Sequence, residues 1–126
     1  MRGAARITRL LAALGVLGIA ACLSPTLPLP PPEEPSFMTV GADGTWTVAG
    51  NCLSGAEVTV INEATGRGEV YVDRERAGHY TVQIEAEPCD VVIISQSLSE
   101  DDSGETRAVL QEVKDGLAVD PAACSP

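Results

Sequence analysis

The sequence predicts an all-β protein whose single domain is a seven-stranded sandwich. Apolar and β-branched residues alternate with polar ones in several short segments, as expected for strands with one face on a core. Turn-forming residues separate these segments about every 8–12 residues, a spacing typical of sandwiches. Residues 91–94 are a continuous apolar run, which indicates a central strand covered on both faces.

Six segments carry the strand signal. The clearest is residues 80–86, in which Tyr80, Val82, Ile84 and Ala86 share one face. In chain order, the predicted strands are residues 45–48, 56–60, 66–72, 80–86, 91–94 and 105–110.

Residues 106–114 offer the one helical alternative. Val109, Leu110 and Val113 would share one face of a helix there. The segment is short and contains β-branched residues, however, and both properties favour a strand.

The N-terminal residues have the pattern of a secretory signal. Arg2, Arg6 and Arg9 make the start basic, and the apolar stretch 10–21 follows without a charge. A transmembrane helix needs about 20 apolar residues, so this stretch is too short to span a bilayer. We therefore expect residues 1–21 to be removed, which changes the formal charge of the chain from −10 to −13 because three arginines are lost.

The apolar stretch ends in Ile19-Ala20-Ala21-Cys22, which resembles the lipobox of bacterial lipoproteins. The resemblance implies a diacylglyceryl group on the Cys22 thiol, cleavage after Ala21 and acylation of the new N-terminus, for example with palmitate. Such chains hold a protein on a membrane at about 0.8 kcal/mol per buried CH₂. Leu23, in place of an Asp, suggests sorting to the outer membrane, facing the periplasm or the surface. The alternative is an ordinary signal peptide with a chance cysteine.

Residues 22–36 have the composition of a spacer. Six of the nine prolines lie between residues 24 and 36, and such a run favours extended polyproline II at about 3.1 Å per residue. We expect it to lift the domain roughly 40 Å from the membrane, and a Pro-rich docking motif is the alternative. The domain is then expected at residues 37–120, followed by a short tail at 121–126.

Within that domain, four segments resemble bacterial immunoglobulin-like domains. They are residues 43–50, 55–60, 77–82 and 90–93, and they include Gly55-Ala56-Glu57-Val58-Thr59-Val60. Carboxypeptidase-regulatory-like and transthyretin-like sandwiches share the middle part. The resemblance implies an immunoglobulin-like sandwich that serves as a spacer, stalk or binding module. Such modules usually occur in tandem, and this chain has one copy.

Three cysteines remain in the exported chain, in a compartment where disulfides form readily. Successive turns of a sandwich alternate between its two ends, and Cys52 is assigned to the first turn and Cys89 to the fifth. Both are then expected at the same end, which favours a Cys52–Cys89 disulfide. Cys124 is left over as a free thiol or an intermolecular partner, and its pairing with either of the others is the alternative.

An acidic loop provides the candidate metal ligands. They are Glu100, Asp101, Asp102 and Glu105. Carboxylate oxygens suit Ca²⁺, but these residues lack the spacing of an EF-hand loop. A solvated acidic loop is therefore the favoured interpretation, and a Ca²⁺ site is the alternative.

Two further residues are candidates for chemistry. His79 is the only histidine, and no nucleophile-elbow sequence accompanies it, so we expect no catalytic triad. Trp46 falls in strand alternation and is expected in the core rather than on a sugar-binding face.

Composition and motifs limit the classes of function that we expect for this chain. The acidic charge repels nucleic acid, so no nucleic-acid partner is expected. The sequence contains no pattern of catalytic residues, and we expect neither an enzyme nor a resident cofactor. The prediction is a lipid-anchored, non-enzymatic interaction module that docks an envelope protein. The alternative is a module that binds Ca²⁺ or a glycan.

Overall fold

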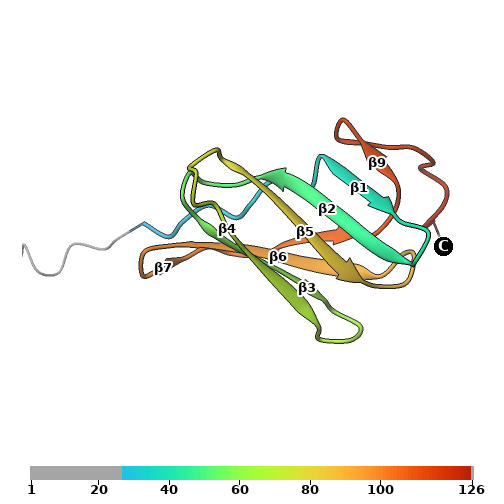
Figure 1. Cartoon of the computed structure of the whole chain (residues 1–126), viewed down its shortest axis with the longest axis horizontal. Helices are drawn as coiled ribbons and strands as arrows, with labels where there is room; N and C mark the ends of the chain where they lie inside the picture. The colour runs from blue at the N-terminus through green and yellow to red at the C-terminus, as the bar shows by residue number, and fades with distance from the viewer. Residues whose placement is uncertain (1–26, 126) are drawn as a thin grey trace, which may run out of the picture.

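In the computed structural model, which describes residues 27–125, the chain forms two antiparallel β-sheets packed face to face (Figure 1). One sheet has the strand order β10-β9-β1-β2-β5, and the other has the order β4-β3-β6, with β7 and β8 both paired to β6. No helix occurs in this part of the chain, and therefore none that is long and apolar enough to cross a membrane. The strands are β1 (Phe37–Val40), β2 (Thr45–Asn51), β3 (Glu57–Asn62), β4 (Gly68–Val72), β5 (His79–Glu85), β6 (Val91–Leu98), β7 (Asp101–Asp102), β8 (Thr106–Val109), β9 (Val113–Lys114) and β10 (Leu117–Ala118).

The all-β prediction is confirmed, and each of the six predicted strands overlaps an observed one. Residues 106–114 hold β8 and β9 rather than a helix. The described residues form ten strands rather than seven. The six segments located in the sequence miss four of these strands. Three of them, β7, β9 and β10, have two residues each, too few to show a period in sequence. The fourth is β1, a strand of four residues that directly follows the proline run.

The core lies between the two sheets and comes from alternate positions of the longer strands. Complete burial of a Val, Leu or Ile side chain stabilises a fold by about 1.5–3 kcal/mol, so this alternation supplies most of the driving force. The buried core residues are Met38, Trp46, Val48, Tyr80, Val82, Ile84 and Val113 from the first sheet, Val58, Val60, Val92 and Ile94 from the second, and Leu110, which directly follows β8.

Strand β6 corrects one expectation. Its apolar run was expected to be covered on both faces, but only Val92 and Ile94 are fully buried. Val91 and Ile93 point to the opposite face and are half-buried. The second sheet therefore has one face on the core and one open face that still carries apolar side chains, because no further layer of residues 27–125 covers it.

The expected spacer is also partly wrong, because its second half packs on the sandwich. Residues 29–36, here called the proline strap, run along the edge of the second sheet. Leu29 forms a parallel bridge with Ser103, Gln96 donates its Nε2 to the Pro30 carbonyl at 2.9 Å, and Thr106 donates its hydroxyl to the Pro32 carbonyl. Proline has no N–H, but its carbonyl accepts normally and its ring is apolar, so a proline run can line an edge.

Candidate interaction surface

The structure does not bring the candidate calcium ligands together. Glu100 lies in the turn that joins β6 to β7. Asp101 and Asp102 form β7, paired with Leu98 and Ser97. Glu105 comes after this hairpin, immediately before β8. Within residues 27–125, no group of three or more potential metal ligands is assembled.

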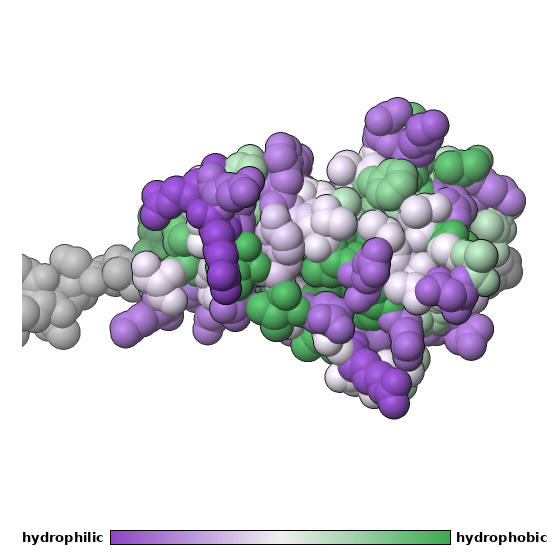
Figure 2. Space-filling view, in the orientation of Figure 1, coloured by the Kyte–Doolittle hydropathy of each residue, from purple (hydrophilic) through white to green (hydrophobic). Residues whose placement is uncertain are grey.

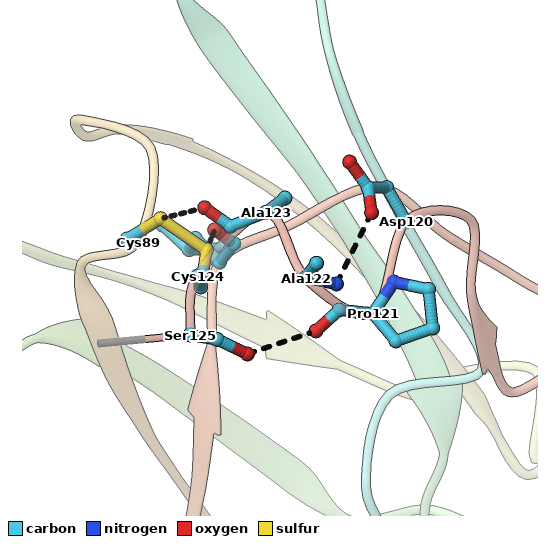
Figure 3. The surroundings of a disulfide bond; sticks show 8 residues. Cys89, Asp120, Pro121, Ala122, Ala123, Cys124 and Ser125 are labelled. Atoms are coloured by element: carbon cyan, nitrogen blue, oxygen red, sulfur yellow. Dashed lines mark hydrogen bonds between the residues drawn. A yellow bond between two sulfur atoms is a disulfide. The ribbon is translucent and has the colours of Figure 1, made fainter.

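The disulfide joins Cys89 to Cys124, with the two Cα atoms 5.5 Å apart (Figure 3). The predicted Cys52–Cys89 pairing is therefore wrong, and the alternative that Cys124 pairs with another cysteine is the observed one. The physical reason is the number of turns between Cys52 and Cys89, which decides the end of the sandwich at which each residue lies. Only β3, β4 and β5 separate Cys52 from Cys89, so Cys89 lies in the fourth turn and at the opposite end of the sandwich.

The C-terminal residues are held against the domain rather than forming a free tail. A turn after Asp120 reverses the chain, and the Asp120 carboxylate accepts the Ala122 N–H at 3.1 Å (Figure 3). This turn directs Cys124 back toward Cys89. The Cys89 N–H donates to the Leu110 carbonyl at 2.8 Å, which fixes the other half of the bridge.

Among the described residues, Cys52 remains a free thiol, at the end of the sandwich where the proline strap arrives. It is half-buried. Burial, followed by the negative charge of Asp73, raises the pKa of the Cys52 thiol. A thiol with a raised pKa holds less thiolate and is a poor nucleophile. The predicted lipidation site, Cys22, lies outside the described residues.

The two remaining candidate residues, His79 and Trp46, both lie in strands of the first sheet. His79 is exposed at the start of β5, with Nδ1 3.0 Å from Oδ1 of Asn51. Trp46 is 2% exposed on β2, so the prediction that it packs in the core is confirmed.

Asp73 organises the connection between β4 and β5. Its buried carboxylate accepts the N–H groups of Gly55 at 3.0 Å, Gly78 at 2.8 Å and Ala77 at 2.9 Å. The bonds from Gly55 and Gly78 are the main cause that lowers the pKa of Asp73, against the effect of burial. This carboxylate ties the β2–β3 and β4–β5 connections together and thereby fixes the point where β4 ends.

A broad groove lies on the surface between β4 and β5. Both are edge strands, one from each sheet, so the sandwich is unsealed along this side. The groove, here called the edge groove, has a volume of about 830 Å³ and is lined by Thr45, residues 67–70 and residues 81–85. Figure 1 shows β5 crossing over β4 at this side, and Figure 2 shows hydrophobic side chains reaching the surface along the middle of the same face.

Backbone hydrogen bonds on β4 show which groups are unpaired. Asn62 N–H donates to the Arg67 carbonyl and Asp73 N–H to the Ala56 carbonyl, at the two ends of the β3–β4 ladder. Because bonded and non-bonded pairs alternate in an antiparallel ladder, the odd-numbered residues of β4 bond to β3. The positions whose N–H and C=O point outward are Gly68, Val70 and Val72.

The same alternation applies to β5, where Cys52 N–H donates to the Gly78 carbonyl and continues the β2–β5 register. Even-numbered residues bond to β2. The outward positions are His79, Thr81, Gln83 and Glu85.

Side chains distinguish the two edges. The outward positions of β5 carry exposed polar side chains. On β4, by contrast, Val70 and Val72 are 56% and 41% exposed. Arg67 and Glu85 span the groove with a 3.5 Å ion pair whose side chains are mostly in solvent, so it contributes little stability. A strand that has one unpaired edge and exposed valines is a surface on which another chain can add a strand.

Comparison with protein families, curated proteins and solved structures finds no match for this chain. The sequence located β4 as a strand but did not mark it as an edge. Edge position depends on pairing between distant segments. The only local signal was the Gly66-Arg67-Gly68 run that opens the strand.

Proposed function

We propose that this chain is a lipid-anchored accessory module of the bacterial cell envelope, with an immunoglobulin-like sandwich that acts by contact with another protein and not by catalysis. The basic start, the short apolar stretch and the lipobox-like Ile19-Ala20-Ala21-Cys22 support the anchor. The two packed antiparallel sheets support the sandwich. The observation that carries the interaction role is the unpaired β4 edge with its exposed valines.

The proline strap brings the domain closer to the proposed anchor than a free spacer would. With Cys22 in the membrane surface, the seven residues from Cys22 to Leu29 can extend about 25 Å at most. In Figure 1 the strap enters at one end of the sandwich, and the disulfide-bonded C-terminus lies at the other. The edge groove runs between these two ends, along a side that is lined by residues of β2, β4 and β5 and not by the proline strap or residues 120–125.

The interaction role is tested with a photo-crosslinking amino acid at Val70 in the full chain, started from Met1 and kept in native membranes. We expect an envelope protein to be captured at Val70. The matched control places the same group at Leu117 on β10, which is 73% exposed in the other sheet. Equal capture at both positions, or no protein captured at Val70, contradicts the proposal.

The anchor is tested separately by the intact mass of membrane-extracted protein. The expected mass is that of the chain from Cys22 with a diacylglyceryl and an acyl group added. A Cys22→Ser variant should leave the membrane fraction. The unmodified mass of the whole chain contradicts the lipoprotein proposal and leaves the crosslinking result standing by itself.

A further inference from the structure

We propose that the protein partner of the β4 edge is a second copy of this chain, and that the two copies join β4 to β4 in an antiparallel, two-fold arrangement. The inference rests on the proposed function, because it names the partner for the same surface. Its test is chosen so that its failure can be told apart from the failure of the proposed function.

The backbone of β4 is available for this pairing. Val70 and Val72 direct their N–H and C=O groups away from β3. Among residues 27–125, only the Val72 carbonyl has another partner, the N–H of Arg74 at 2.9 Å. A carbonyl has two lone pairs, so this oxygen still accepts a second bond. If Val70 lies opposite Val72 of the second copy, symmetry repeats the pair, and each pair exchanges two N–H···O bonds.

The side chains favour that register. It places each exposed valine against a valine of the other copy on the open face of the sheet, which removes apolar surface from water. The strand centre then falls at Tyr71, a half-buried residue that meets Tyr71 of the second copy, and paired aromatic residues stabilise neighbouring strands.

Charge is complementary at the two ends of this register. Arg67, whose side chain is 78% exposed, comes beside the turn that holds the exposed Glu75 of the second copy, and symmetry repeats this approach at the other end. Sliding the strands by two residues one way brings Glu69 beside Glu75, and sliding them by four residues the other way sets Glu69 opposite Glu69. Both of these registers place like charges together, which destabilises a strand pair. Sliding by two residues the other way sets Val70 opposite Val70 and leaves each Val72 opposite Gly68, so that register removes less apolar surface from water.

One contact in this register brings two acidic residues together. Glu69 comes opposite Asp73 of the second copy, which is also acidic. The Asp73 carboxylate turns into its own loop, however, and accepts three backbone N–H groups there. The like charges are therefore separated, and Asp73 is 1% exposed.

The neighbouring strand β5 is the less suitable edge. Its outward positions alternate with buried ones and carry His79, Thr81, Gln83 and Glu85, all exposed. A second copy of β5 would bury these polar side chains without gaining apolar contact.

The pairing is expected to be weak in solution. A five-residue strand from each copy buries less than the roughly 1,000 Å² of a stable interface, and the acidic charge of each copy opposes association. Confinement on a membrane raises the effective concentration. The two-fold axis is perpendicular to the sheet, so both anchors reach one membrane when the sheets lie parallel to it.

The test uses the full chain in membranes, with Cys52→Ala and the other native cysteines kept. Val70→Cys and Val72→Cys chains, carrying different tags, are co-expressed and oxidised. Residues in a hydrogen-bonded antiparallel pair have Cα atoms about 5.5 Å apart, which suits a disulfide. We expect the mixed 70–72 dimer to form severalfold more than either homodimer. Thr81→Cys and Gln83→Cys on β5 are the matched controls and should stay monomeric.

A second variant removes the pairing without depending on oxidation. Val70→Pro deletes an outward N–H that has no partner in the part of the chain that the structure describes, a position where an edge strand tolerates proline. It should abolish chemically crosslinked dimers, whereas Gln83→Pro on β5 should not. An unchanged urea midpoint of unfolding shows that each variant is folded.

Each remaining outcome overturns the inference. A dominant 70–70 dimer shows a different register, a β5 dimer shows the wrong edge, and the absence of any β4 dimer removes self-pairing. If Val70 then still captures a different protein in the photo-crosslinking experiment, the proposed function stands and only the second copy is rejected. If Val70 captures nothing, both fall.

Discussion

The ring of Tyr80 lies over Gly50, its direct partner across β2 and β5, and a Cβ on Gly50 would stand 2.9 Å from the phenolic oxygen. The glycine leaves room for a large aromatic side chain, which is 1% exposed. Burial is the main reason that the pKa of Tyr80 is raised well above its usual value. The pair therefore closes the core at the end of the sandwich that holds Cys52.

We expect Gly50→Ala to destabilise the fold by about 1–3 kcal/mol, because the methyl group must displace a packed ring. The control is Gly104→Ala, where an added Cβ meets nothing within 4 Å. Urea unfolding of both variants provides the measurement. Equal midpoints for the two alanine variants would show that the ring can move without cost.

The Cys89–Cys124 disulfide should be a major source of stability. It closes a loop with a sequence separation of 35 residues, for which the chain-entropy treatment gives about 4 kcal/mol. We therefore expect the Cys89→Ser/Cys124→Ser variant to unfold at much lower denaturant concentration.

Cys52→Ser is the matched control for this disulfide. It should unfold nearly as the parent does, because Cys52 has no disulfide partner among the described residues. Mass mapping of the unreduced protein checks the connectivity directly. A Cys52–Cys89 peptide in that map would refute the assignment.

Local pattern identified the strands, because alternation along one segment is enough to reveal a half-buried strand. It located β5 within one residue at each end. It could not reveal β9 or β10, since two residues show no period, nor which strands lie at the edges. Those properties depend on pairing between distant segments.

The sites were harder to predict than the strands. The predicted Cys52–Cys89 disulfide was wrong because a difference of one turn places a residue at the opposite end of a sandwich. The prediction of a free spacer was partly wrong for another reason. Proline composition indicates an extended chain but does not say whether that chain meets an acceptor surface, and here Gln96 and Thr106 supply donors to its carbonyls.

Gln96 should be the most sensitive contact of the proline strap. Its side chain is 4% exposed, donates to the Pro30 carbonyl and accepts the Leu53 N–H at 2.8 Å. Gln96→Leu leaves both backbone groups without that partner, and we expect a loss of about 1–3 kcal/mol.

Hydrogen exchange locates the effect of Gln96→Leu. The Leu53 amide should exchange faster in that variant, while exchange in the β3–β6 ladder stays slow. Gln83→Leu, at an exposed position of β5, is the control and should change neither quantity. Unaltered exchange at Leu53 in Gln96→Leu would show that the hydrogen bond does not form.

Asp73 should make stability depend on pH in the acid range. Backbone N–H groups, chiefly those of Gly55 and Gly78, lower its pKa below the usual 3.8 in the folded protein. A carboxyl group with a lower pKa when folded stabilises the fold above its unfolded pKa, and this contribution is lost as the pH falls through the folded pKa. In the Asp73→Asn variant, the side chain at position 73 is an amide and does not titrate in this pH range. The difference in unfolding free energy between parent and variant should therefore be largest near neutral pH and shrink with acid.

Chemical unfolding of parent and Asp73→Asn from about pH 6 to pH 2 measures this difference. Asp43→Asn is the comparison, because the pKa of Asp43 is also lowered, by the backbone and side chain of Thr45, but at an exposed turn. Its effect should have the same sign and be smaller, since it accepts fewer backbone N–H groups. A parent–variant difference for Asp73 that stays constant down to the lowest pH would mean that its carboxylate is not held by the loop.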